Sequence, residues 1–192
     1  MGGEDRVFET DREAAYRSLS AVLPPHSLLT DPEDLRPYEC DGLSAYRQVP
    51  MVVALPANED EVAKILATCH AMGVPVVPRG AGTGLSGGAL PVAEGVVVSV
   101  ARLNRIVEID LESQRVVVEP GVANLDVSRA VAAHGFFYAP DPSSQQVCTI
   151  GGNVAENSGG AHCLKHGFTV NHVTGLDLVL PDGELVRLGG KG

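Results

Sequence analysis

The stretch that decides the fold is RGAGTGLSGG, residues 79–88, in which five of ten residues are glycine. It follows an apolar run, VPVVP (74–78), with the composition of a buried strand. Residues 82–87 match G-x-G-x-x-G, the spacing of a dinucleotide-binding loop. In the Rossmann fold that loop opens a helix, and the pyrophosphate lies on the helix N-terminus. Here Pro91 and Gly95 follow, and the next strand ends without an acidic residue, so we exclude the Rossmann interpretation.

A glycine-rich loop can still hold an anion without a helix. Glycine has no Cβ and tolerates positive φ, so consecutive backbone N–H groups can converge on one phosphate. The stretch also lacks the Gly-Lys-Ser/Thr of a P-loop, and with a net charge of −10 few lysines are at hand to help. The alternative is a mobile surface loop, and this stretch alone leaves both interpretations open.

Upstream, the pattern predicts a βαβ unit. Residues 49–55 (VPMVVAL) read as a strand, and Asn58 with Glu61 forms a capping box that opens a helix ended by Gly73. Residues 74–78 are the second strand, and 95–100 (GVVVSV) give a further buried strand. Residues 11–23 predict an amphipathic helix ended by Pro24-Pro25, within an N-terminal helical segment that we place at 1–48.

Downstream, the pattern favours antiparallel strands. Residues 106–121 alternate and predict a hairpin turning at Glu112-Ser113, and 174–188 predict another around Pro-Asp-Gly. Between them we expect a helix capped by Asn124 and closed by Gly135, then a long loop over 136–163. A loop of that length in a compact domain is usually functional. The predicted fold class is α+β, with two α/β subdomains: a small βαβ unit, then a largely antiparallel sheet with helices.

The long loop supplies a second wall for a ligand. It contains Gly151-Gly152-Asn153 and Asn157-Ser158-Gly159-Gly160, with small hydroxyl groups nearby. Two glycine-rich walls between two subdomains suit a ligand with a diphosphate and two polar ends. His162, Cys163, His166 and His172 could suggest a metal site, but glycines flank the stretch. We therefore expect these residues to line the ligand cavity or to pack beneath it, and expect no metal.

Composition narrows the function classes. A net charge of −10 without a basic block argues against nucleic-acid binding. No apolar run approaches the roughly 20 residues of a transmembrane helix. The four cysteines form no C-x-x-C pair, which argues against an iron–sulfur cluster or a zinc ribbon within the chain. We expect a cytoplasmic protein with reduced cysteines.

Four motifs in this order resemble a known family. They are PRGAGTGLSGG (78–88), PDPSS (140–144), TIGGNVAENSGG (149–160) and GLDLVLPDG (175–183). Together they resemble the FAD-binding domain of the vanillyl-alcohol oxidase family, the p-cresol methylhydroxylase (PCMH) type. Within it, the resemblance is greatest to glycolate oxidase GlcD subunits and other FAD-linked 2-hydroxy-acid dehydrogenases. We place this domain at 49–192, truncated at its C-terminal end and without the family's cap domain.

The resemblance implies a site for FAD between the two subdomains. Residues 79–85 would wrap the pyrophosphate, 151–153 and 158–160 would lie along the ribityl chain and isoalloxazine, and 140–144 would shape the flavin side. A histidine that attaches FAD covalently in some relatives is replaced by Thr83, which implies non-covalent FAD. No catalytic residue is assigned. The implied cofactor-binding residues are Pro78, Arg79, Gly80, Ala81, Gly82, Thr83, Gly84, Leu85, Pro140, Asp141, Ser144, Thr149, Gly151, Gly152, Asn153, Ser158, Gly159 and Gly160.

The implied activity is oxidation of glycolate, or a related D-2-hydroxy acid, to the 2-oxo acid. The resemblance also implies other glycolate oxidase subunits as partners, an iron–sulfur subunit among them, and through them attachment to the inner face of the membrane. Three alternatives stay open: a D-lactate or D-2-hydroxyglutarate dehydrogenase, a non-catalytic nucleotide-binding module, and a cell-wall precursor reductase with a similar FAD domain. The 192-residue chain by itself is expected to be inactive.

Overall fold

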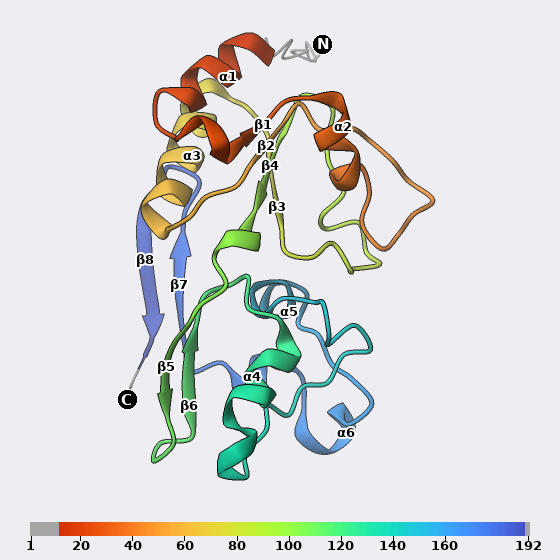
Figure 1. The fold of residues 1–192 in the computed structure, drawn as a ribbon, viewed down its shortest axis with the longest axis vertical. Helices are drawn as coiled ribbons and strands as arrows, with labels where there is room; N and C mark the ends of the chain where they lie inside the picture. The colour runs from red at the N-terminus through yellow and green to blue at the C-terminus, as the bar shows by residue number, and fades with distance from the viewer. Residues whose placement is uncertain (1–11, 191–192) are drawn as a thin grey trace, which may run out of the picture.

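The computed structural model describes residues 12–190 and divides them into two packed parts (Figure 1). The first is a four-stranded sheet between helices. The second consists of a hairpin and short helices, and a C-terminal hairpin runs beside both parts. The helices are α1 (Arg12–Ser20), α2 (Pro32–Leu35), α3 (Glu59–Met72), α4 (Asn124–Val131), α5 (Ile150–Glu156) and α6 (Cys163–His166). The strands are β1 (Leu28–Leu29), β2 (Val52–Ala54), β3 (Val76–Arg79), β4 (Val96–Ser99), β5 (Ile106–Asp110), β6 (Arg115–Val118), β7 (Gly175–Val179) and β8 (Leu185–Gly189).

The first sheet has the strand order β1-β2-β4-β3. Strands β2, β4 and β3 are parallel, with Val97 paired to Val53 on one side and to Val77 on the other, while β1 is antiparallel to β2. The predicted βαβ unit is therefore present as β2-α3-β3. Its two strands are not neighbours, however, because β4 lies between them. Since β1 joins this sheet, the N-terminal segment is part of the same layer.

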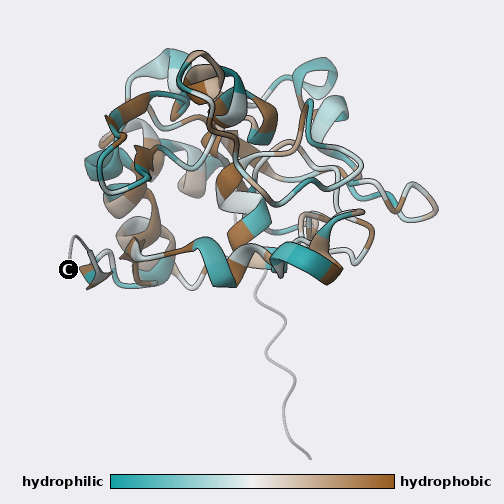
Figure 2. Ribbon diagram, turned by 90° about the horizontal axis from the view of Figure 1, so that it is seen from below, coloured by the Kyte–Doolittle hydropathy of each residue, from teal (hydrophilic) through white to brown (hydrophobic). Residues whose placement is uncertain are grey.

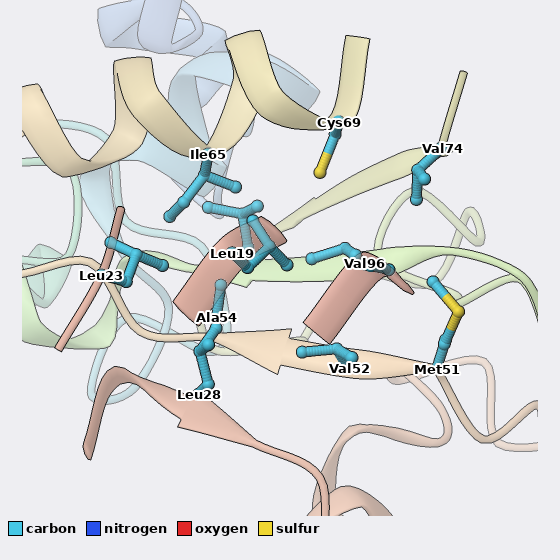
Figure 3. Close-up of a cluster of buried hydrophobic side chains, with 12 residues drawn as sticks. Leu19, Leu23, Leu28, Met51, Val52, Ala54, Ile65, Cys69, Val74 and Val96 are labelled. Carbon is cyan, nitrogen blue, oxygen red and sulfur yellow. The ribbon is translucent and has the colours of Figure 1, made fainter. Parts of the chain in front are cut away.

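Alternation along the strands builds a core on each face of the sheet. On one face, Val52, Ala54 and Val96 pack against Leu19 of α1 and Ile65 of α3 (Figure 3). Their neighbours in sequence point to the other face, where Val53 and Val97 pack against Leu35 of α2. Because successive side chains of a strand point to opposite faces, an all-valine strand can fill both cores at once. The burial of β2 and β4 on both sides follows from this composition.

Helix α3 has the ends that its sequence predicts. The Asn58 side chain accepts a hydrogen bond from the Glu61 N–H at 2.9 Å, and the Glu61 carboxylate accepts one from the Ala57 N–H at 2.8 Å. The hydrogen bond to the Glu61 carboxylate therefore comes from Ala57, the residue before the N-cap. Gly73 ends the helix in the left-handed conformation, with φ 68°. The Asn58 cap and the glycine stop are confirmed, while the second bond of the predicted capping box goes to Ala57 rather than to the N-cap itself.

In the second part, two predictions about the helices are wrong. Asn124 does not cap α4 but is its first residue, and its buried side chain bonds elsewhere. Residues 136–163 are not one loop, because they contain α5, which opens at Thr149 and ends at Asn157 in the left-handed conformation. The closing glycine of α4, Gly135, is confirmed after a short 3-10 turn.

Both predicted hairpins are present. Strands β5 and β6 pair antiparallel with a bulge near Val107, and β7 and β8 pair antiparallel through the Pro-Asp-Gly turn. The second hairpin returns to the first part of the molecule and lies beside α3 (Figure 1). A Cβ on Gly183 would be 2.8 Å from the Ala63 carbonyl oxygen, and Arg187 lies 4.0 Å from Glu59. The C-terminal turn therefore packs directly on α3.

Apolar and polar segments are interspersed over the whole ribbon (Figure 2). Within residues 12–190, no helix has the length and apolar character needed to cross a bilayer.

Candidate functional site

The glycine loop, residues 80–89, follows the carboxyl end of β3 and reaches β4 without forming a helix. The structure thus agrees with the exclusion of a Rossmann loop. From Ala81 to Ala89, no backbone N–H group forms a hydrogen bond with any described residue. Unpaired donors in succession are what an anion-binding loop requires. This run of free N–H groups is the most informative feature of the site.

The glycines of the loop are required for different reasons. A Cβ on Gly80 would be 2.2 Å from the Thr149 hydroxyl oxygen, so that glycine is needed for packing between the two loops. Gly82 and Gly87 have φ of 69° and 81°, which side chains other than glycine rarely adopt. Gly84 has neither constraint, because a Cβ there would meet nothing within 4 Å. The surface at Gly84 is open to a ligand.

Arg79 lies beneath this loop and is 8% exposed. Its guanidinium donates to the Cys40 carbonyl at 2.7 Å and to the Pro37 carbonyl at 3.4 Å, and it stacks on the Tyr38 ring at 5.5 Å. A Cβ on Gly82 would be 2.2 Å from its Nη2 atom. The side chain therefore holds the loop from below. Its hydrogen bonds go to backbone carbonyls, one of them that of Ala89 in the loop itself, at 3.5 Å.

A segment that the sequence patterns did not connect with the site, residues 37–43, backs the glycine loop. A Cβ on Gly42 would be 2.8 Å from the Thr83 carbonyl oxygen and 2.7 Å from that of Gly84. Asp41 is 5% exposed; one carboxylate oxygen accepts from the Leu43 N–H at 2.8 Å, and the other has no hydrogen-bond partner among the described residues. The only sequence signal for this contact is the Asp-Gly pair itself.

The second wall meets the first, as the sequence predicts. Ser86 donates to Glu156 at 2.7 Å, and a Cβ on Gly88 would be 2.3 Å from the same carboxylate. Thr149 reaches Gly80 from the other end of α5. The glycine loop thus lies along α5, and the two segments together form one surface.

The residues of α5 are placed mainly by contacts within the protein. The Thr149 hydroxyl caps the helix by accepting from the Gly152 N–H at 3.3 Å. Gly151 packs against Pro120, where a Cβ would be 2.6 Å from the proline ring. The Asn153 side chain is buried, and its oxygen accepts from the Asn124 amide at 2.9 Å, which also donates to the Pro140 carbonyl at 3.1 Å. The Asn124 side chain therefore bonds to Asn153 and Pro140 and does not cap α4.

The segments 140–144 and 158–160 come together at Asp141. The Gly160 backbone approaches it so closely that a Cβ would be 2.2 Å from the carboxylate. His162 contacts the same carboxylate twice, through its N–H at 3.2 Å and its ring Nδ1 at 2.5 Å. The hydrogen bonds from His162 hold the pKa of Asp141 below its ordinary value. The His162 side chain is otherwise largely exposed.

The remaining predicted site residues have simpler surroundings. Ser158 accepts twice from Thr169 through its carbonyl, at 3.0 Å and 2.8 Å, and Gly159 lies against the Phe168 ring. The Ser144 carbonyl accepts from the N–H groups of Val147 and Cys148. Pro78, in β3, and Leu85, in the glycine loop, are exposed.

The three histidine side chains do not meet at one point, although the His172 Nε2 atom lies 2.8 Å from the His166 carbonyl oxygen. His162 pairs with Asp141, His166 packs edge-on against Phe137, and His172 packs edge-on against Tyr138. Over residues 12–190, no group of three or more His, Cys, Asp or Glu side chains is placed to hold a metal ion. A hollow of about 390 Å³ lined by Val49, Met51 and Glu94 lies at the amino ends of β2 and β4, away from the glycine loop.

Comparison with known proteins finds a matching family model and several similar curated proteins. Residues 50–189 match the family model described as an FAD binding domain. The chain is 51% identical over 181 residues to glycolate oxidase subunit GlcD of Escherichia coli (strain K12), covering 94% of this chain and 36% of that protein. It is 47% identical over 154 residues to GlcD of Bacillus subtilis (strain 168), with 80% and 33% covered. It is 35% identical over 168 residues to D-lactate dehydrogenase of Anaerostipes hadrus, with 87% and 35% covered.

Solved structures show the same fold. Alkyldihydroxyacetonephosphate synthase superposes with a TM-score of 0.81 at 22% identity, covering 93% of this chain and 38% of that one. p-Cresol methylhydroxylase, solved with substrate bound, gives 0.72 at 21% identity, covering 91% and 35%. The α+β fold class is thereby confirmed, and at these identities the likeness concerns the fold alone. The chain spans about a third of the length of the curated relatives it matches.

Proposed function

The chain belongs to the family of FAD-binding domains, of the PCMH type, and from this we propose that it forms the FAD-holding part of an oxidoreductase acting on glycolate or a related D-2-hydroxy acid. The product would be the 2-oxo acid. The observation that carries the proposal is the glycine loop, whose successive N–H groups are free and whose surface is open at Gly84.

The residues present fit FAD. In our proposal the N–H groups from Ala81 to Leu85 hold the pyrophosphate, as a backbone site suits a chain of net charge −10. The backbone of Gly151, Gly152 and Ser158–Gly160 lines the ribityl and flavin portion. Asn153 and Arg79 act through the position they give to α5 and to the loop, since their polar atoms bond within the protein. Pro140, Asp141 and Ser144 shape the flavin side.

FAD, when bound, supplies the chemistry of the oxidation by accepting the hydride from the carbon that carries the substrate hydroxyl. In our proposal the protein binds the cofactor and orients it. We assign no residue of this chain to removal of the hydroxyl proton. We propose non-covalent FAD because Thr83, in the loop, has no side chain suited to a flavin bond.

Glycolate is proposed as substrate because two relatives near 50% identity are named for glycolate oxidase, while the D-lactate dehydrogenase is 35% identical. A non-catalytic module has less support, since these relatives are named as enzymes. We also propose that other glycolate oxidase subunits, an iron–sulfur subunit among them, accept the electrons in the cytoplasm, at the inner face of the membrane.

The test is an absorbance spectrum of the purified full-length protein, before and after FAD addition and desalting. We expect retained flavin bands that denaturation releases, and bleaching of those bands by glycolate more readily than by D-lactate or D-2-hydroxyglutarate. Absence of flavin from the wild-type protein would reject the proposal. Bleaching by D-lactate alone would show that D-lactate, and not glycolate, is the substrate.

A matched pair of variants tests the loop itself. Ala81 is exposed within the run of free N–H groups. Ala81→Asp places a negative charge there and is expected to weaken FAD binding at least about tenfold relative to Ala81→Asn, which has the same shape without the charge. Equal affinities of the two variants, measured by fluorescence titration, would exclude a phosphate at this loop.

A further inference from the structure

Arg79 is a buried cation that forms no ion pair with any residue the structure describes. No carboxylate within residues 12–190 forms an ion pair with it, and its hydrogen bonds go to backbone carbonyls only. Burial lowers the pKa of Arg79 from its ordinary value, against an opposing electrostatic effect of Cys40, Tyr38 and Asp41. A guanidinium nevertheless stays charged in proteins. A buried charge normally finds a partner of opposite sign, so this one calls for an explanation.

Arg79 lies on the carbonyl side of the loop. Gly42, from the same backing segment, approaches the carbonyl oxygens of Thr83 and Gly84. In a planar trans peptide the N–H points opposite to the C=O, so the N–H groups of Gly84 and Leu85 point away from that segment. Arg79 bonds to this segment at Cys40 and Pro37. The Arg79 guanidinium therefore lies on one side of the glycine-loop backbone, and the unpaired N–H groups of Gly84 and Leu85 point to the other side.

Asp41 lies in the same layer and is also incompletely paired. One of its oxygens is buried without a hydrogen-bond partner among the described residues, and it does not close an ion pair with Arg79 although the two are electrostatically coupled. Its negative charge opposes that of Arg79 at the loop. The potential at the N–H groups therefore depends on both residues.

We propose that Arg79 provides the fixed positive charge of the pyrophosphate site, acting through the glycine loop from behind without touching the phosphate, and that Asp41 reduces that potential. This inference rests on the proposed function and deepens it. It explains how a chain of net charge −10 can attract a dianionic cofactor to a loop whose own side chains carry no charge. Arg79 is a positioning residue in this scheme, because it acts through the field and through the backbone.

The magnitude is measurable. Two unit charges about 7 Å apart at an effective dielectric constant of 20–40 interact strongly enough to change a binding constant about tenfold or more. A purely structural Arg79 would instead affect FAD binding only as far as it affects folding. Charge and structure can be separated because lysine retains the charge but cannot form the forked bonds to two carbonyls.

The experiment compares wild type, Arg79→Met, Arg79→Lys and Asp41→Asn in the full-length protein, with FAD and the phosphate-free riboflavin as ligands. Both Arg79 variants are expected to unfold at lower temperature. We expect Arg79→Met to bind FAD about tenfold more weakly and Arg79→Lys to stay within about threefold of wild type. Asp41→Asn, which keeps the oxygen that accepts from Leu43, is expected to bind FAD more tightly. Riboflavin affinity should stay constant throughout.

Two results would overturn the inference while leaving the FAD site in place: Arg79→Lys and Arg79→Met losing FAD affinity equally, or riboflavin affinity falling in parallel with FAD affinity. Unchanged FAD affinity in Asp41→Asn would remove Asp41 from the scheme. Failure of wild type to bind FAD would reject the proposed function itself, which the other results do not.

Discussion

At the scale of single residues, the glycines divide into those that the protein requires and those that it does not. Gly80 is required, because a Cβ there would overlap the Thr149 hydroxyl. Gly84 has no such neighbour and no positive φ. No contact within the described residues requires a small residue at Gly84, whereas Gly80 is part of the packing between the glycine loop and α5.

Gly80→Ala is expected to lower the free energy of unfolding by about 1–3 kcal/mol, because the added methyl group overpacks a contact that cannot open freely. Gly84→Ala is the matched control and is expected to leave stability unchanged or raise it slightly, by reducing the entropy of the unfolded chain. Urea denaturation of both variants measures the difference. Equal urea midpoints for the two variants would show that the glycine loop moves to accommodate the methyl group at residue 80.

The Asp141–His162 pair predicts a pH dependence. Hydrogen bonds from His162 lower the pKa of Asp141 in the folded protein. A carboxyl group with a depressed folded pKa stabilises the fold above its unfolded pKa, and that contribution is lost as pH falls through the folded pKa. Wild type should therefore lose stability below about pH 4 in part through this group, and Asp141→Asn should lose less. Thermal unfolding between pH 3 and 6 measures both proteins. Parallel pH profiles would contradict the assignment.

At the scale of elements, α5 aligns the two glycine-rich walls, and its first turn depends on one side chain. The Thr149 hydroxyl accepts from Gly152 and is the N-cap. Thr149→Val keeps the shape and removes the acceptor, at a cost of about 1 kcal/mol, so the Gly152 amide should exchange with solvent about fivefold faster. Thr149→Ser keeps the oxygen and should preserve the wild-type exchange rate, as measured by NMR. Similar rates in both variants would show that the cap is not what holds this turn.

The elements that the sequence predicts are those whose signals are local. The ends of α3 are set by Asn58, Glu61 and Gly73, and both hairpins by alternation and turn residues, all within a few positions. Helix α5 was missed because Gly151 and Gly152 lower helix propensity, and the requirement for Gly151 comes from Pro120, distant in sequence. The local sequence predicts Asn124 as a helix cap, but its side-chain amide instead donates a hydrogen bond to Asn153, which is distant in sequence.

The site follows the same division. The sequence predicts that the two glycine-rich segments form two walls of one site, and in the structure Ser86 of the first bonds to Glu156 beside the second. It does not predict that residues 37–43 form the back of the loop or that Arg79 turns inward to them, because those contacts join segments through tertiary packing. The assignment of individual residues to FAD stays a prediction.

At the scale of the whole molecule, the two hairpins have incompletely covered apolar faces. Leu176, Leu178, Val186 and Leu188 share one face of the C-terminal hairpin, and Leu188 is 50% exposed. Ile109 of β5 is 41% exposed. Exposed apolar faces beside free strand edges favour association between copies.

We expect the 192-residue chain to self-associate with rising concentration, and Leu188→Lys to reduce that association with little effect on folding. Leu85→Lys is the control, since it changes an exposed leucine of the glycine loop that belongs to neither hairpin. Sedimentation equilibrium measures both variants. Equal reduction by the two substitutions would point to a general effect of added charge.

The docking of the C-terminal hairpin on α3 has a consequence during synthesis. Helix α3 ends at Met72, whereas β7 begins at Gly175, roughly a hundred residues later. At about 5–20 residues per second, the ribosome delivers the hairpin some 5–20 seconds after the helix that it covers. For that interval the nascent chain presents the Ala63–Ala67 surface of α3 uncovered, and this is the time in which chaperones or neighbouring nascent chains can reach it.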